Sequence, residues 1–441
     1  MSDLDALGCF WPAGQPDNRL PGRLALDAKR GPVLELWGLF HDPGRVVEQA
    51  LAEDGSASIG FSEMFGSGRP PIRILGETTQ GPVSLDQCLV GRSSRSLLGR
   101  SGSSTAEYHA LQVFQGAHLD DRTPLHFDAV TFRLGHLEEW IARSGLSVEQ
   151  HPDGKADDRI RITVPPPARY ATSTDLGELA VACRYTPRGN GIVGIRIDRD
   201  CSVELRSSEG RPLDQILEAA AAVQDLVTMG VAAPSRVSGI WLSHPSTQSR
   251  IRLWAQWRGD DADAGASSAI HPAKMLFTYD VIGGLEGIAR WLPVWKKFSL
   301  CAGTLTGRWY TPQTGYSDFF STVAAAETFE RIRRDESKVN LKKGLCELVS
   351  AVGKPFRDLV ADVDRWASRI VQTRDNYVVH PGLHGNPDGE DLYWQTELVY
   401  TLIVLRLLRA CGLQEGALPN RDNSEPIKRL AGRLADQAGG A

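Results

Sequence analysis

The 441-residue chain lacks any apolar run long enough to cross a membrane as a helix. Its longest apolar run, residues 398–405, is interrupted by Thr401 and ended by Arg406, whereas a spanning helix needs about 18 or more apolar residues. The first five residues are acidic and lack the apolar core of a signal peptide. We therefore expect a cytoplasmic protein without a membrane partner.

Cysteine is scarce, and a basic excess is absent. The seven cysteines are an odd number, are widely scattered and form no CxxC pair, so the sequence predicts neither disulfides nor structural zinc. The net charge is -5 and the pI is near 6.1. A protein that coats nucleic acid needs a basic surface, because its cations release counterions from the phosphates. Any contact with RNA is therefore expected to be local.

Three common enzyme signatures are also missing. The chain has no GxSxG elbow, no Walker lysine loop and no glycine fingerprint for dinucleotides. Its composition is that of an ordinary globular protein, with 41% hydrophobic and 23% charged residues. The length suffices for two or three domains with full cores. The chemistry therefore has to be sought in a local stretch of the chain.

The first 260 residues are dominated by short segments rich in β-branched and aromatic residues, a pattern typical of strands. Predicted strands cover residues 23–26, 33–37, 72–75, 130–134, 160–164, 180–185, 191–197, 202–206, 239–243 and 251–257. Helices are predicted at 137–143 and 213–229, and a surface loop rich in Ser, Gly and Arg at 91–105. This region is therefore expected to be a β-rich domain built on antiparallel sheet.

The rest of the chain has helical periodicity. A connector helix is predicted at 276–298, with Trp291 and Trp295 one turn apart in its core face, followed by an extended piece to residue 310. Further helices are predicted at residues 317–334, 341–352, 355–379, 390–411 and 425–435. The sequence thus predicts an α+β chain of three parts: a β-rich N-terminal domain at 1–260, a linker and connector helix at 261–314, and an all-α bundle at 315–441.

One stretch at the end of a predicted helix carries candidate chemistry, Thr373-Arg374-Asp375-Asn376-Tyr377-Val378-Val379-His380-Pro381-Gly382. Pro381 disfavours a helical His380, so the helix is expected to end at about Val379 or His380. On an unbroken helix, the six-residue separation places Arg374 and His380 about 120° apart. They converge on one anion only if the helix breaks, or if two copies meet across a twofold axis.

Two other interpretations of this stretch stay open. Because the spacing of Arg374 and His380 also arises by chance, the first is a solvated arginine followed by a helix-ending histidine. The second is a metal triad of His380, His384 and Asp388, although the Pro and Gly residues between them deny these side chains a shared helix. We predict no metal and no cofactor.

The stretch resembles the Arg-polar-x-x-x-(x)-His signature of HEPN domains, the all-helical ribonuclease modules of prokaryotic defence and toxin systems. The resemblance extends over roughly residues 315–435, with five residues between Arg374 and His380 where four is common. Upstream, three segments resemble the opening of the N-terminal domain of ApeA-like anti-phage proteins: Gly8-Cys9-Phe10-Trp11-Pro12, Leu20-Pro21-Gly22-Arg23-Leu24 and Leu34-Glu35-Leu36-Trp37-Gly38.

This resemblance implies an endoribonuclease of abortive infection that cleaves RNA, with tRNA as one candidate substrate, by metal-independent acid/base chemistry. His380 would be the general acid/base and Arg374 the phosphate clamp, with Asp375 or Asn376 orienting either group. The N-terminal domain would sense a phage-derived trigger and regulate the nuclease, and the HEPN domain would form a homodimer. The alternative is a non-catalytic dimeric interaction protein, with a degenerate HEPN bundle and a β-rich domain that binds a ligand.

Overall fold

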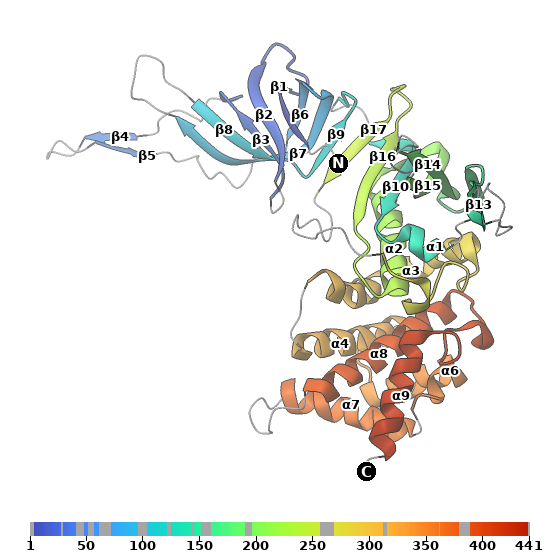
Figure 1. Cartoon of the computed structure of the whole chain (residues 1–441). Coiled ribbons are helices and arrows are strands. Elements are labelled where there is room, and N and C mark those ends of the chain that lie inside the picture. Colours follow the sequence, from blue (N-terminus) through green and yellow to red (C-terminus); the bar gives the residue numbers. More distant parts are fainter. Residues whose placement is uncertain are drawn as a thin grey trace. The chain divides into compact units, whose positions relative to one another are not determined.

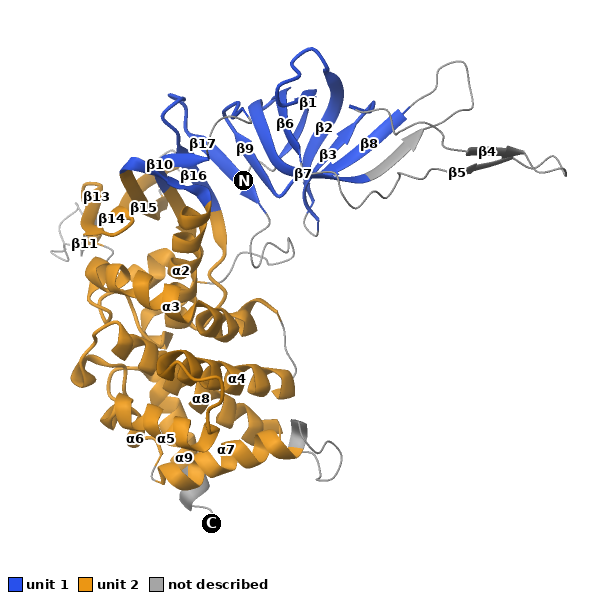
Figure 2. Cartoon of the chain, turned by 180° about the vertical axis from the view of Figure 1, so that it is seen from behind, with its two compact units in different colours: residues 1–130, 208–213, 239–265 blue, residues 131–207, 214–238, 266–441 orange. Residues whose placement is uncertain are grey.

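A computed structural model describes residues 4–27, 30–40, 48–51, 57–60, 72–95, 104–120, 125–142, 145–150, 160–189, 196–255, 269–311, 315–360, 362–378 and 389–439 (Figure 1). The chain divides into two compact units (Figure 2). Unit 1 comprises Met1–Val130, Ser208–Leu213 and Gly239–Gly265. Unit 2 comprises Thr131–Ser207, Asp214–Ser238 and Ala266–Ala441.

Unit 1 contains a closed antiparallel barrel. Each strand pairs with the next in the order β7, β6, β1, β2, β3, β8, and β8 pairs back with β7. Closure leaves these six strands without a free edge. Their bounds are β1 Asp5–Pro12, β2 Leu20–Asp27, β3 Gly31–Leu36, β6 Ile72–Thr78, β7 Gly81–Arg95 and β8 Ser104–His109.

The 15-residue strand β7 closes the barrel because its two halves pair differently. Residues 83–86 pair with β9 (Gln112–Gln115), and residues 89–95 pair with β8. A register shift between Val90 and Ser93 marks a bulge, and bulges bend strands. The loop predicted at 91–105 is therefore wrong at both ends, since 91–95 continue β7 and Ser104 begins β8. Residues 96–103 lie outside the described part.

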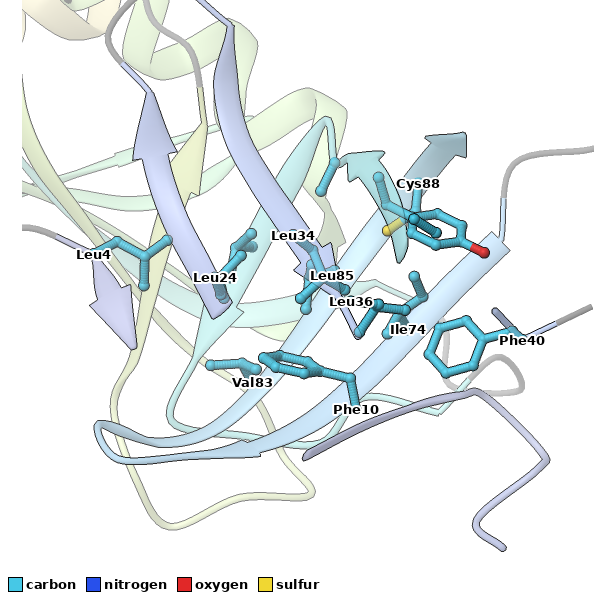
Figure 3. Packing of buried hydrophobic residues seen from close by; sticks show 14 residues of the cluster. Leu4, Phe10, Leu24, Leu34, Leu36, Phe40, Ile74, Val83, Leu85 and Cys88 are labelled. Atoms are coloured by element: carbon cyan, nitrogen blue, oxygen red, sulfur yellow. The ribbon is translucent and has the colours of Figure 1, made fainter. Parts of the chain in front are cut away.

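The barrel core is filled by side chains that alternate along the strands (Figure 3). Phe10 is one of these side chains and is fully buried. A Cβ at Gly76, on the neighbouring strand β6, would overlap the Phe10 ring, so glycine at this position makes room for the aromatic side chain. The other labelled core residues are Leu4, Leu24, Leu34, Leu36, Phe40, Ile74, Val83, Leu85 and Cys88.

Further strands accompany the barrel. β17 (Ile251–Ala255) pairs with β9 on one side and with β16 (Val237–Ser243) on the other. β16 and β10 (His126–Leu134) contribute residues to both units. A separate two-stranded ribbon is formed by β4 (Glu48–Leu51) and β5 (Ala57–Gly60).

The antiparallel strands β13 (Ala168–Thr174), β14 (Gly177–Arg188) and β15 (Arg196–Pro212) form one end of the sheet that also contains β10 and β16. They belong to unit 2, except for residues 208–212 of β15, which belong to unit 1. A separate hairpin is formed by β11 (Ser147–Gln150) and β12 (Ile160–Thr163). Cys183 on β14 lies directly opposite Cys201 on β15, with their Cα atoms 4.3 Å apart, and a disulfide joins them. The prediction of no disulfides was therefore wrong. It failed because the hairpin register, not the sequence spacing, brings these cysteines together.

The remaining elements are helices: α1 Leu137–Ile141, α2 Leu213–Val231, α3 Gly284–Tyr310, α4 Gly315–Arg334, α5 Leu341–Val352, α6 Lys354–Arg357, α7 Val363–Val378, α8 Gly389–Ala410 and α9 Glu425–Gly439. Short 3-10 turns lie at Pro272–Lys274 and Glu415–Ala417. The predicted α+β class, with a β-rich N-terminal region and an all-helical C-terminal bundle, is confirmed. Among the described residues, no helix has both the length and the apolarity to traverse a bilayer.

Two helices differ from their predicted limits. α3 kinks at Phe298, whose φ and ψ are -115° and 22°, but continues to Tyr310 because Cys301, Ala302 and Leu305 extend its buried face. The extended piece predicted before residue 310 is therefore helical, and the predicted start at 276 is wrong, because α3 begins at Gly284. The helix predicted at 355–379 is instead divided into α6 and α7. A carboxylate oxygen of Asp362 accepts from the backbone N–H of Arg365 at 2.9 Å and so caps a new helix start.

The connector α3 packs against α2 within unit 2. Trp291 is fully buried, and its Nε1 donates to the carbonyl of Ala222 at 2.7 Å. One turn later, Nε1 of Trp295 donates to Asp225 at 2.8 Å. The predicted core role is confirmed for Trp291, whereas Trp295 is half-buried. The compact units group α2 with the C-terminal helices, and the predicted domain limits at 260 and 314 stay a prediction.

Candidate active site

Helix α7 carries Arg374 one turn before its last residue, Val378. The helix is fixed by its buried face, since Trp366, Ala367 and Ile370 recur at steps of one and three residues and are at most 8% exposed. This face packs against α5. The periodicity that predicted the helix thus also orients the Arg374 side chain with respect to the bundle.

Two carboxylates hold the guanidinium of Arg374. Nε donates to Oδ1 of Asp375 at 2.8 Å, and Nη2 lies 2.7 Å from the same oxygen. Nη1 donates to Oε1 of Glu327, which lies on α4. The side chains of Arg374, Asp375 and Glu327 are 29%, 43% and 27% exposed. This group, which we call the Arg374 cluster, is therefore within reach of a molecule in solution.

The hydrogen bonds of Arg374 leave part of its guanidinium available. A guanidinium has five N–H donors, and these contacts occupy one each on Nε, Nη1 and Nη2. Within the described part of the chain, two N–H groups of Arg374 therefore remain. A bidentate contact with phosphate oxygens uses two donors on one edge of the guanidinium. The arrangement is thus suited to holding a phosphate group.

Some of the other predicted site residues are described by the structure, and others are not. Of the two predicted supporting residues, Asp375 contacts Arg374, whereas Asn376 is half-buried on α7. His380 lies outside the described residues, as do His384 and Asp388. The convergence of Arg374 and His380 therefore stays a prediction. In the part of the chain that the structure describes, no group of three His, Cys, Asp or Glu side chains is placed to hold a metal ion.

Glu327 is the contact that the sequence prediction missed. It lies in the run Val323-Ala324-Ala325-Ala326-Glu327-Thr328-Phe329, where Val323, Ala326 and Phe329 are buried. An isolated carboxylate in such an apolar stretch is a signal that a partner of opposite charge lies on another element. The sequence did not indicate that this partner is Arg374, because the two residues are 47 positions apart.

A second arginine, Arg308 on α3, also lies between two carboxylates. Its Nη2 donates to Asp318 on α4 at 2.7 Å and to Glu397 on α8 at 2.6 Å. Here the arginine side chain is only 8% exposed. Burial raises the pKa of both carboxyls because it disfavours their charged form, and Arg308 opposes this shift. We call these three residues the Arg308 cluster.

Comparison with known families places the Arg374 cluster, whereas Arg308 lies between the two matched regions. The ApeA N-terminal domain 1 family matches residues 5–291, and the Apea-like HEPN family matches residues 318–417. The second match includes Glu327, Arg374 and His380. No curated protein and no solved structure matches the chain. Since the first match covers more than half of the 441 residues, the predicted resemblance is confirmed, and the chain belongs to the ApeA family, with an Apea-like HEPN domain near its C-terminus.

Proposed function

We propose that the protein is an anti-phage endoribonuclease whose HEPN domain cleaves RNA without a metal ion. Membership of the ApeA-like HEPN family supports an anti-phage nuclease role. The observation that carries the proposal is the partly exposed guanidinium of Arg374, two of whose N–H donors are not occupied by described residues, inside the matched HEPN region. In this role Arg374 clamps the phosphate and His380 transfers protons, with Asp375 and Asn376 as supporting residues.

Cleavage of RNA needs few protein groups besides Arg374 and His380. The 2′-hydroxyl is an internal nucleophile beside the phosphorus, so its attack forms a cyclic phosphate while the 5′-oxygen leaves. The histidine takes the proton of the 2′-hydroxyl and a proton is returned to the leaving oxygen. Histidine suits this task because its usual pKa of about 6.5 gives both protonation states near neutrality. Arginine stabilises the charge that builds on the phosphate oxygens.

The test is cleavage of total RNA, tRNA included, by the purified full chain in EDTA. His380→Ala and Arg374→Ala should each lower the rate of cleavage at least about 100-fold with little change in the melting curve, and a substrate with 2′-deoxy at the cut position should resist. Cleavage of the deoxy substrate, or activity lost to EDTA and restored by a divalent metal, overturns the mechanism. Failure of the wild-type protein to cleave any RNA, with extract of phage-infected cells added, favours the non-catalytic interaction protein instead.

The protein is further proposed to act as a homodimer through its HEPN domain. On one helix Arg374 and His380 point about 120° apart, and twofold apposition of two helices would bring two of each to one cleft. Sedimentation should therefore show a dimer at micromolar concentration. A monomer with full cleavage activity contradicts this proposal.

Regulation by the N-terminal region is the last part of the proposal. A constantly active ribonuclease would harm its own cell, and the ApeA N-terminal domain 1 match covers most of the chain outside the HEPN match. We expect this region to restrain the nuclease in the cytoplasm until it binds a phage-derived trigger. RNA cleavage by the full chain should then increase on infection. Equal cleavage in infected and uninfected cells contradicts the proposed restraint.

A further inference from the structure

Glu327 contacts Arg374 from a different helix, and this geometry points to a role for it in the proposed reaction. We infer that Glu327 is a positioning residue, which fixes the Arg374 guanidinium with its two remaining N–H donors available to one phosphate. The inference rests on the proposed ribonuclease function. It assigns to α4 a part in a site that the sequence motif places wholly on α7 and the residues after it.

The two carboxylates of the Arg374 cluster differ in what they can fix. Asp375 is the next residue on α7, so it moves with the helix that carries Arg374. It therefore cannot set the position of the guanidinium relative to the rest of the bundle. Glu327 can, because α4 is a separate element. Among the described contacts of Arg374, the one with Glu327 joins it to another helix.

The backbone around Glu327 is well anchored. Ala326 and Phe329 are at most 1% exposed, and the ring of Phe329 stacks on that of Phe298 with centroids 4.4 Å apart. One turn further along α4, Glu330 is 2% exposed and binds Arg333 and Arg334. A carboxylate fixed in this way can hold a long arginine side chain in one orientation, which lowers the entropy lost when the phosphate binds.

An opposite role is also conceivable for a carboxylate at this position. One arginine and two carboxylates give the Arg374 cluster a formal charge of -1 (+1 and -2), which would repel a phosphate and so restrain the enzyme. Restraint would be strongest if the carboxylates also covered the donors that the phosphate would use. Two N–H groups of Arg374 stay uncovered by described residues, so the geometry favours positioning. The two roles predict opposite changes in rate when Glu327 is removed.

The experiment compares Glu327→Ala and Glu327→Gln with Glu347→Ala in the full chain. Glu347 is a matched control, because it is a partly exposed glutamate that binds Arg333 and Arg334 of α4 rather than Arg374. We expect Glu327→Ala to lower kcat about 10- to 100-fold while KM changes less than about threefold, since a misplaced clamp weakens the transition state more than the ground state. Glu327→Gln should lose less, because its amide keeps an acceptor oxygen. Glu347→Ala should cleave like the wild type.

A double variant separates positioning from general structural damage. In an Arg374→Ala background, Glu327→Ala should cause no further loss, because the two residues act as one unit. Three outcomes would overturn the inference. They are a further loss of activity in the Arg374→Ala background, an equal loss in Glu347→Ala, and a Glu327→Ala enzyme that cleaves RNA at least as fast as the wild type. If Glu327→Ala fails to fold, the same comparisons are made with Glu327→Gln. The pH profile of cleavage by Glu327→Gln should keep the wild-type shape, because Glu327 transfers no proton. An inactive wild-type protein instead overturns the proposed function and this role with it.

Discussion

The Arg308 and Arg374 clusters use the same chemistry in different surroundings. In each, two carboxylates hold one guanidinium, and at least one of them comes from another helix. The arginine side chain is 8% exposed in the first cluster and 29% exposed in the second. Exposure is thus the main difference between them, and it changes what each cluster contributes to the protein.

The buried cluster ties three helices together. Arg308 on α3 joins Asp318 on α4 to Glu397 on α8, and Tyr400 packs against the guanidinium, 5.1 Å from ring centroid to Cζ. Charges that are removed from water in this way depend on one another, because a lone buried charge is costly. The exposed cluster depends less on its pairing, because water replaces a lost partner. Its guanidinium is partly exposed and has donors that described residues leave unoccupied.

The comparison shows that carboxylate partners alone do not identify a functional arginine. Arg308 and Arg374 both lie near the ends of helices, α3 and α7. What separates them is whether the guanidinium is sealed inside the bundle or retains N–H groups at its surface. Four predictions make this difference measurable.

The largest effect is expected from breaking the buried cluster. Arg308→Ala leaves Asp318 and Glu397 buried without their cation, which should lower the free energy of unfolding by about 3–5 kcal/mol. Urea unfolding followed by circular dichroism measures this loss. Neutralising both acids in the same chain, with Asp318→Asn and Glu397→Gln, should recover part of it. A loss of less than about 1 kcal/mol would mean that the cluster is not structural and would remove the contrast with Arg374.

Removing the exposed arginine should have a large effect on RNA cleavage and a small effect on stability. Arg374→Ala is expected to lower the rate of RNA cleavage about 100- to 1,000-fold, because a donor to the developing phosphate charge is lost. The free energy of unfolding should change by less than about 1 kcal/mol, since the ion pairs are partly exposed. Cleavage kinetics and urea unfolding on the same preparation test both statements. Arg374→Lys serves as the control, because it keeps the charge and loses the bidentate geometry.

Much of the fold was predictable because it depends on local patterns. The helix at 341–352 was predicted to the residue, since its apolar spacing ends at Gly353, whose φ of 84° suits glycine. The strands β2 and β3 and helix α2 also lie where their patterns indicated. Local signals of this kind need no knowledge of the partner element.

The features that were missed depend on pairing between distant residues. The second half of β7 is rich in Ser, Gly and Arg and was predicted as loop, yet the ladder with β8 keeps residues 91–95 extended. The disulfide between Cys183 and Cys201 depends on the register of β14 with β15. Tertiary pairing thus overrode local propensity in both places.

The candidate site also contains residues that the sequence predicts and one that it does not. Arg374 and the contact of Asp375 with it were accessible to sequence reasoning, because both lie in one short motif on α7. Glu327 was not, because only the packing of the bundle brings α4 to Arg374. A motif therefore names the residues of a site that are close in sequence. The residues that orient them come from elsewhere in the fold.

A smaller effect is the pH dependence of stability that the buried Arg308 cluster produces. Burial raises the folded-state pKa of Asp318 and Glu397 above their usual values of 3.8 and 4.5. The folded state thus binds these protons more tightly than the unfolded chain, so this stabilisation is complete below the usual values and is lost as pH rises through the raised pKa values. Glu397→Gln removes one titrating group. Its unfolding free energy should therefore fall less than that of the wild type between about pH 4 and pH 7.

Urea unfolding of both proteins across this pH range provides the measurement. Asp318→Asn, which removes the other raised carboxyl, should flatten the profile in the same direction. A wild-type protein whose stability rises over this range while the Glu397→Gln protein stays level would contradict the direction of the effect. It would mean that Arg308 outweighs burial in setting the pKa of these carboxyls.

The smallest effect concerns an ion pair on α7 that does not involve Arg374. Lys342 on α5 lies 2.8 Å from Asp364 on α7, and the two side chains are 41% and 75% exposed. Lys342→Ala should lower the free energy of unfolding by less than about 0.5 kcal/mol, because water and salt screen such a pair. RNA cleavage should be unchanged, since this contact leaves the Arg374 guanidinium in place. Unfolding at low and high salt, with cleavage kinetics alongside, measures both. If Lys342→Ala slows cleavage as much as Arg374→Ala does, any disturbance of α7 disables the enzyme, and the loss in Arg374→Ala could no longer be ascribed to its unused N–H donors.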